Sequence, residues 1–171
     1  MATQPKKLDD LFHDTLKDIY FAEKKIFIAL PKMAKAAQNE ELAAAFEKHE
    51  GETEGQIERL EQVFGLIDRR PQGKNCPAII GIVEEAQEII KEYKGSPALD
   101  AGLVGAAQAV EHYEISRYGT LQAWAKELGL DEAVELLQAT LEEEEATDEA
   151  LTDLAEAVIN QQAEDEEEAA A

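Results

Sequence analysis

Cysteine, proline, glycine and basic side chains are all scarce in this chain of 171 residues, and each shortage narrows the class of protein. A single cysteine, Cys76, cannot form an internal disulfide, which favours a reducing compartment. No apolar run approaches the roughly 20 residues that a membrane helix needs, and residues 1–7 lack the apolar stretch of a secretion signal. We therefore expect a cytoplasmic protein that does not enter a membrane.

Positive charge is in especially short supply. Lys and Arg together number 16 against 38 Asp and Glu, which gives a formal net charge of -22. A surface this acidic is repelled by phosphate backbones and by anionic lipid headgroups, and the basic stripe typical of nucleic-acid binding is absent from the sequence. We therefore expect neither nucleic acid nor a membrane surface as a partner.

Long stretches rich in Ala, Leu, Glu, Lys and Gln lie between the few prolines and glycines, and these are helix-forming residues. No stretch alternates apolar and polar residues with β-branched enrichment, so the sequence predicts an all-α protein without strands. Apolar residues at three- and four-residue steps, together with helix-ending signals, predict helices over residues 8–38, 40–64, 77–93, 97–128 and 131–161. The inward stripe of the first helix comprises Phe12, Leu16, Ile19, Ile26, Leu30 and Met33.

The lengths of the connections predict how these helices are arranged. Short links near Asn39 and Gly129 make two antiparallel hairpins, whereas the middle connection takes about thirty residues and carries the short helix 77–93. A helix of about 31 residues is roughly 46 Å long, a distance that thirty residues can span. The prediction is a ferritin-like four-helix bundle over residues 1–161, with one long crossover, followed by an acidic disordered tail over residues 162–171.

Acidic residues interrupt the apolar stripes at positions that should face the core. Glu23, for example, lies four residues after Ile19 and three before Ile26. Residues equidistant from a hairpin turn lie side by side, and by this rule the inward carboxylates of each hairpin fall at one level near mid-helix. The candidate metal ligands chosen in this way are Glu23, His49, Glu52, Glu111, Glu114, Glu144 and Asp148.

A buried cluster of carboxylates needs compensating positive charge, since burial of each uncompensated ion costs several kcal/mol. Arg117 is the one basic residue that the sequence places near the cluster on a compatible face, so we expect bound cations. Bundles that hold two irons or manganeses use inward glutamates with Glu-x-x-His pairs. Oxygen ligands with few imidazoles suit iron or manganese better than zinc or copper. The sequence therefore predicts a dinuclear iron centre, with manganese as the alternative.

Four segments, in order along residues 5–160, resemble the YciE/YciF family of bacterial stress-associated, ferritin-like proteins. The resemblance implies a ferritin-like fold, a dinuclear metal centre and self-association, which we expect to give a dimer. The chain departs from the wider ferritin and rubrerythrin pattern at Gly55 and Thr147, where that pattern has histidine. The segments are Tyr20-Phe21-Ala22-Glu23-Lys24, Glu52-Thr53-Glu54-Gly55-Gln56-Ile57-Glu58-Arg59, Val110-Glu111-His112-Tyr113-Glu114-Ile115 with Tyr118-Gly119-Thr120-Leu121, and Thr140-Leu141-Glu142-Glu143-Glu144 with Ala146-Thr147-Asp148.

Three functions are compatible with these predictions. The leading hypothesis is a redox protein with a role in oxidative stress, whose metal centre reacts with O₂ or a peroxide. The alternative is a non-catalytic structural or stress assembly protein with an incidental metal site. Storage of iron is a third hypothesis, and it requires a cage-forming assembly.

Overall fold

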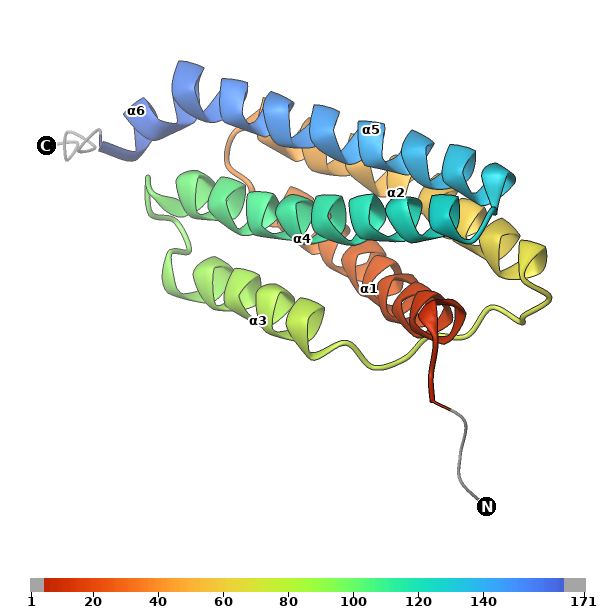
Figure 1. Cartoon of the computed structure of the whole chain (residues 1–171). Coiled ribbons are helices and arrows are strands. Elements are labelled where there is room, and N and C mark those ends of the chain that lie inside the picture. The colour runs from red at the N-terminus through yellow and green to blue at the C-terminus, as the bar shows by residue number, and fades with distance from the viewer. Residues whose placement is uncertain (1–4, 165–171) are drawn as a thin grey trace, which may run out of the picture.

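All regular structure in residues 5–164, the part of the chain that the computed structural model describes, is helical (Figure 1). The all-α prediction is therefore confirmed for these residues. The last long helix continues through a π-helical turn into a final short helix, so the two form one continuous rod. The elements are α1 (Leu8–Ala36), α2 (Glu40–Leu66), α3 (Pro77–Glu92), α4 (Leu99–Glu127), α5 (Asp131–Leu154), the π-helical turn η1 (Ala155–Ile159) and α6 (Asn160–Glu164).

Two hairpins, α1 with α2 and α4 with α5, pack together as the predicted ferritin-like four-helix bundle, with α2 against α5 and α1 against α4. The first turn is closed by Asn39, whose side chain accepts hydrogen bonds from the Glu41 and Leu42 amides and so caps α2. The second turn contains Gly129 at φ +70°, a conformation that favours glycine. Asp100 joins the hairpins by accepting hydrogen bonds from the Gln38 and Asn39 amides at 2.8 and 2.7 Å.

The crossover between the hairpins carries α3, as the sequence predicts, and α3 packs against α1 and α4 along one side of the bundle (Figure 1). Its extended leading segment is fixed to α1 by a 3.0 Å hydrogen bond from the Lys74 amide to the Lys17 carbonyl. Pro77 then starts α3, where its fixed φ suits a first helical position. The bundle thus has a fifth helix that covers the seam between α1 and α4.

Helix ends differ from the predictions by a few residues. The differences are two residues at three places: α1 ends at Ala36, α2 ends at Leu66, and α4 begins at Leu99 and not at Pro97. Ser96 forms a turn ahead of the helix, in which its carbonyl accepts from the Leu99 amide and its hydroxyl from the Ala98 amide. At the C-terminal end, residues 162–164 belong to α6, so the predicted disordered tail does not begin at 162. The remainder of that tail, 165–171, lies outside the described residues.

The core runs the length of the bundle, and every residue of the predicted stripe on α1 is buried. Pro31 lies inside α1, which continues through it. Among residues 5–164, none of the helices is both long enough and apolar enough to cross a membrane. The core is not apolar throughout, because polar side chains replace apolar ones near the middle of the four long helices.

Candidate metal centre

The four long helices each place at least one ionisable side chain inside the core. Glu23 on α1, His49 on α2, Glu111 and Glu114 on α4, and Glu144 on α5 are all buried, with at most 2 % of each residue exposed. Each lies three, four or seven residues from buried apolar neighbours on its own helix, so the same face that buries the apolar stripe also buries these groups. The bundle therefore brings together residues up to about 120 positions apart in the sequence.

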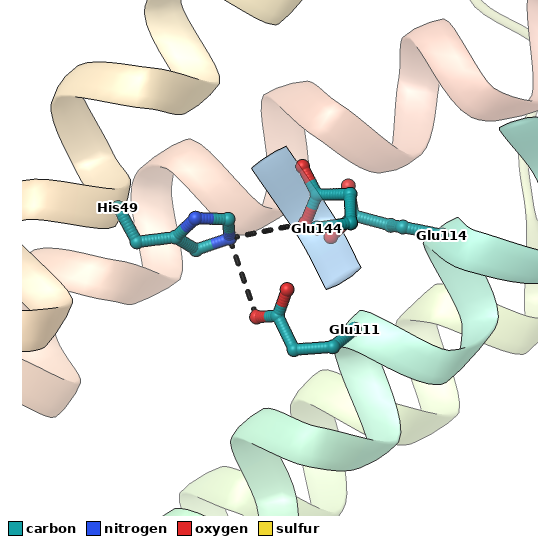
Figure 2. Close-up of side chains that lie close together, drawn as sticks. All are labelled: His49, Glu111, Glu114 and Glu144. Carbon is teal, nitrogen blue, oxygen red and sulfur yellow. Dashed lines mark ion pairs between the residues drawn. The ribbon is translucent and has the colours of Figure 1, made fainter. Parts of the chain in front are cut away.

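Four of these side chains converge on one point (Figure 2). His49, Glu111, Glu114 and Glu144 each offer a ligand atom, and these atoms all lie within 4.8 Å of one another. The His49 Nε2 atom lies 3.3 Å from Glu111 Oε1 and 3.7 Å from Glu144 Oε2. Nitrogen and oxygen atoms at this spacing, contributed by three helices, form a site that could hold a metal ion.

Most polar atoms of this cluster have no hydrogen-bond partner among the described residues. Both carboxylate oxygens of Glu114 are buried and unpartnered, and so is one oxygen on each of Glu23, Glu111 and Glu144. Both ring nitrogens of His49 are in the same condition. Because buried polar groups in proteins are nearly always satisfied, so many unpartnered atoms at one place are consistent with a site that could hold a cation.

Burial and mutual repulsion shift the proton affinities of the cluster. Burial, with the charge of Glu144 second, raises the pKa of Glu23 to about 8, and burial raises the pKa of Glu111 to about 7. The pKa values of Glu114 and Glu144 are also raised well above the ordinary value, mainly by burial. Burial alone would lower the pKa of His49, but Glu52, Glu144 and Glu23 outweigh it and the net shift is upward. Without a metal, these upward shifts favour the protonated, uncharged forms of the buried carboxyls.

Glu23 lies beside the four converging residues and is held by a tyrosine. Tyr118 is completely buried and its hydroxyl donates a short hydrogen bond to Glu23 Oε1. The other oxygen of Glu23 has no hydrogen-bond partner among the described residues, so it remains available to a cation. Glu23, oriented by Tyr118, thus adds a buried carboxylate beside the four residues that could hold a metal.

Glu52 and Asp148, the other two predicted ligands, lie at the edge of the cluster. The side chain of Glu52 is 24 % exposed, forms an ion pair with Lys48 and places Oε2 3.6 Å from His49 Nδ1. Asp148 is 22 % exposed and accepts hydrogen bonds outside the cluster, from Gln108 at 3.1 Å. An ion pair of 3.2 Å with His112 keeps it there. Glu52 thus connects the cluster to solvent, whereas Asp148, held at the edge by Gln108 and His112, is not among the residues whose ligand atoms converge.

A second group of residues, which the sequence analysis did not single out, supports the cluster from α2 and α5. Gln56 is fully buried and its amide donates to both Glu143 and Glu144. Arg59 pairs with Glu143 and donates to Thr140 at 2.8 Å. Gln56 lies one further helical step along the inward face of α2, after His49 and Glu52. This periodicity could have identified Gln56 as a buried residue from the sequence.

Arg117, the basic residue that the sequence analysis placed near the cluster, makes its contacts elsewhere. Its guanidinium lies 5.1 Å from the ring of Tyr113 and its Nε lies 3.8 Å from Asp18, on the side of α4 that faces α1 and the crossover. Glu114, by contrast, has no hydrogen-bond partner among the described residues. Thr147, at a position where the wider ferritin pattern has histidine, is buried with its hydroxyl unpartnered. Arg59 is therefore the guanidinium connected to the cluster, through Glu143 and Gln56.

The residues present fit a metal ion. They offer carboxylate oxygens and one imidazole in a buried site, and the atoms that could bind metal are those that lack hydrogen-bond partners. This donor set suits hard or borderline divalent ions such as iron and manganese.

Comparisons with known proteins agree with this fold. Protein YciF from Escherichia coli strain K12 is 47% identical over 160 residues, which cover 93% of this chain and 96% of that protein. The crystal structure of the E. coli stress protein YciF matches with a TM-score of 0.87 and 46% identity, over 92% of this chain and 99% of that one. The YcfI protein from Rhodopseudomonas palustris matches with a TM-score of 0.83 and 47% identity, over 89% and 97%.

A more distant structure, of a protein from Xanthomonas campestris pv. campestris, is 22% identical with a TM-score of 0.70 and shows the fold alone. It covers 90% of this chain and 94% of that one. The family described as "Domain of unknown function (DUF892)" matches residues 7–164. This match spans all four long helices and every candidate ligand. On this evidence, and as the resemblance to YciE/YciF proteins predicted, the chain belongs to the DUF892 family, with a ferritin-like fold.

Proposed function

We propose that this protein is a cytoplasmic stress protein whose buried cluster holds two iron ions, or two manganese ions, and uses them to reduce O₂ or a peroxide. The observation that carries the proposal is the set of buried oxygens and imidazole nitrogens without hydrogen-bond partners. The relatedness to the E. coli stress protein YciF supports the physiological setting.

Charge balance favours two ions over one. The four buried carboxylates Glu23, Glu111, Glu114 and Glu144 carry four negative charges when ionised, which two divalent cations neutralise. One divalent ion would leave two buried carboxylates that must either take up protons or remain as uncompensated charges, each of which costs several kcal/mol. Glutamates that bridge or cap a pair of ions are the usual arrangement in helical bundles of this kind.

Two ferrous ions, when bound, supply two electrons, which with two protons convert O₂ to H₂O₂ or H₂O₂ to two molecules of water. The side chains of this chain determine the surroundings of that reaction. Glu114 and Glu144 lie in a water-excluded core, where burial raises their pKa values in the metal-free protein, so binding of metal would displace their protons. Tyr118 fixes the orientation of Glu23, and Gln56 fixes that of Glu144.

The proposal is tested by metal binding and oxidation in a matched pair of variants. Glu144→Gln removes a buried ligand, whereas Glu145→Gln removes the same charge from the exposed neighbouring position. Anaerobic titration with Fe²⁺ should give two ions per chain in the wild type and in Glu145→Gln, and clearly fewer in Glu144→Gln. Exposure to O₂ or H₂O₂ should then produce the near-ultraviolet absorbance of ferric iron in the first two proteins. Equal binding by both variants would refute this ligand assignment.

The second candidate is a structural or assembly role with an incidental metal site. It is favoured by the description of the R. palustris relative YcfI as a structural protein and by four large apolar side chains on the surface: Leu11, Ile28, Leu66 and Tyr93. Metal binding without turnover would support this candidate. Under either function we propose that the chain forms a homodimer through such exposed apolar residues, and sizing chromatography distinguishes a dimer from a monomer or a cage.

A further inference from the structure

The centre has two different surroundings, one polar and one apolar. On the polar side, Glu52 of α2 is partly exposed and connects His49 to solvent through its ion pair with Lys48. The apolar side lies beneath α3, which packs against α1 and α4, whereas α2 packs against α1 and α5. The covering helix α3 is therefore separate from the elements that form the polar edge.

A small cavity beneath α3 reaches the centre. Its open space is about 10 Å³, which is room for one water-sized molecule. Except for one carboxylate, every lining side chain is aliphatic or the thioether of a methionine. The lining residues are Ile26, Ala29, Leu30 and Met33 of α1, Val83 and Ala86 of α3, and Ala107, Val110 and Glu111 of α4.

Glu111 connects this cavity to the candidate ligands. Its Oε1 atom lies 3.3 Å from His49 Nε2, as the dashed line in Figure 2 marks, while its Oε2 atom is buried and has no hydrogen-bond partner among the described residues. Only 1 % of Glu111 is exposed, so this end of the cavity is enclosed by the protein and not open to solvent. At the other end, Ala29 and Val83 are only half-buried, and they mark the seam between α1 and α3 where the cavity approaches solvent.

We propose that this cavity is the entry route of molecular oxygen to the centre, and that metal ions and peroxide enter by the polar edge at Glu52. The proposal rests on the function proposed above and assigns a separate route to each of its two possible oxidants. Apolar cavities stay dry and accept apolar guests, and because the open space here is so small, O₂ would pass as the surrounding side chains move. A peroxide would lose the hydrogen bonds of both hydroxyl groups on entering it, whereas O₂ has none to lose.

The first test locates O₂ in the metal-free protein. Dissolved O₂ is paramagnetic, so under O₂ pressure it should shift and relax the methyl resonances of Ala29, Ala86 and Ala107 more than that of Ala133, a fully buried alanine outside the cavity. The same sample under N₂ gives the diamagnetic reference. Equal effects at all four methyl groups would overturn the proposal.

The second test fills the cavity. Ala29→Leu fills the cavity at its half-buried end, and Ala86→Leu fills it from the covering helix α3. If one of these variants fails to fold, the other still tests the route. Ala109→Leu is the control, because it adds the same atoms on the exposed face of α4. Both cavity variants should still bind iron, and should slow its oxidation by O₂ about tenfold or more, since an overfilled apolar site admits a guest only at added cost. Oxidation by H₂O₂ should change by less than about twofold, because the substitutions alter neither the candidate ligands nor the polar edge by which peroxide enters.

The results separate a wrong route from a wrong function. Unchanged O₂ rates in both iron-binding cavity variants, or equal slowing with O₂ and H₂O₂, would overturn the route while the function stands. A wild-type protein that binds iron but is oxidised by neither reagent would overturn the proposed function and the route with it. Selective loss of the O₂ reaction, with Ala109→Leu behaving as wild type, would establish the route.

Discussion

The metal-free protein should become less stable as the pH rises from 5 to 8, because its buried carboxyls must hold protons to remain folded. Burial and the charge of Glu144 raise the pKa of Glu23 from 4.5 to about 8. At a pH below the ordinary pKa of 4.5, this carboxyl is protonated in both the folded and the unfolded chain. Between the two values the unfolded chain has released the proton and the folded chain has not, so the free energy of unfolding falls with increasing pH.

The size of this effect follows from the shift. Over three pH units at 1.36 kcal/mol per unit, Glu23 alone accounts for roughly 4 kcal/mol, which is a large part of the 5–15 kcal/mol typical of a domain. Glu111 acts in the same direction up to its pKa of about 7, and the raised pKa of His49 does so as well. Because these groups interact, their contributions are not additive, and we expect a total on the order of 5 kcal/mol.

Urea unfolding, followed by circular dichroism with a chelator present, measures this dependence at constant ionic strength. The net charge of -22 also produces a general loss of stability with pH, so the comparison is made between variants. Glu23→Gln should flatten the profile and be more stable than wild type at pH 8, whereas the exposed Glu145→Gln should keep the wild-type slope. Equal slopes in the two variants, or wild-type stability that is constant or rises from pH 5 to 8, would refute the reasoning.

Two further predictions concern the packing around the centre. Gly105→Ala should stabilise the protein by about 0.5–1 kcal/mol, because the new methyl group meets nothing and alanine favours a helix, whereas Gly102→Ala should lose this gain because its Cβ would lie 2.7 Å from Ile89 Cγ2. Thermal unfolding of both variants measures this difference, and an equal gain in stability would contradict the prediction. Tyr118→Phe should lower the free energy of unfolding of the metal-free protein by about 1–2 kcal/mol, since it removes the hydroxyl that donates to Glu23. An unchanged urea midpoint would contradict that role of Tyr118.

Much of the fold and part of the site follow from helical periodicity. A step of three or four residues defines one face of a helix, so the apolar stripe of α1 also identifies Glu23 as inward-facing. The two short links and one long link determine which helices form hairpins. The position of α3 against the bundle, by contrast, depends on tertiary packing that no local pattern specifies.

The ligand set was harder to predict because inward and outward positions differ by modest rotations. Asp148 lies four residues after Glu144, which is 40° past a full turn, and this rotation is enough to place it at the edge with Gln108. Glu52 lies three residues after His49, 60° short of a full turn, and is partly exposed. The contacts of Arg59 depend on how α2 is rotated against α5, which periodicity within one helix does not determine.

The most direct measurement is the metal content of the protein purified without added metal and then dialysed against Fe²⁺ or Mn²⁺ under nitrogen. Elemental analysis should find close to two ions per chain in the wild type, and far less than one in the double variant Glu111→Gln/Glu144→Gln, with both proteins folded. A wild-type protein that stays free of metal, or a double variant that binds as much as wild type, would contradict the claim that cations balance these buried carboxylates.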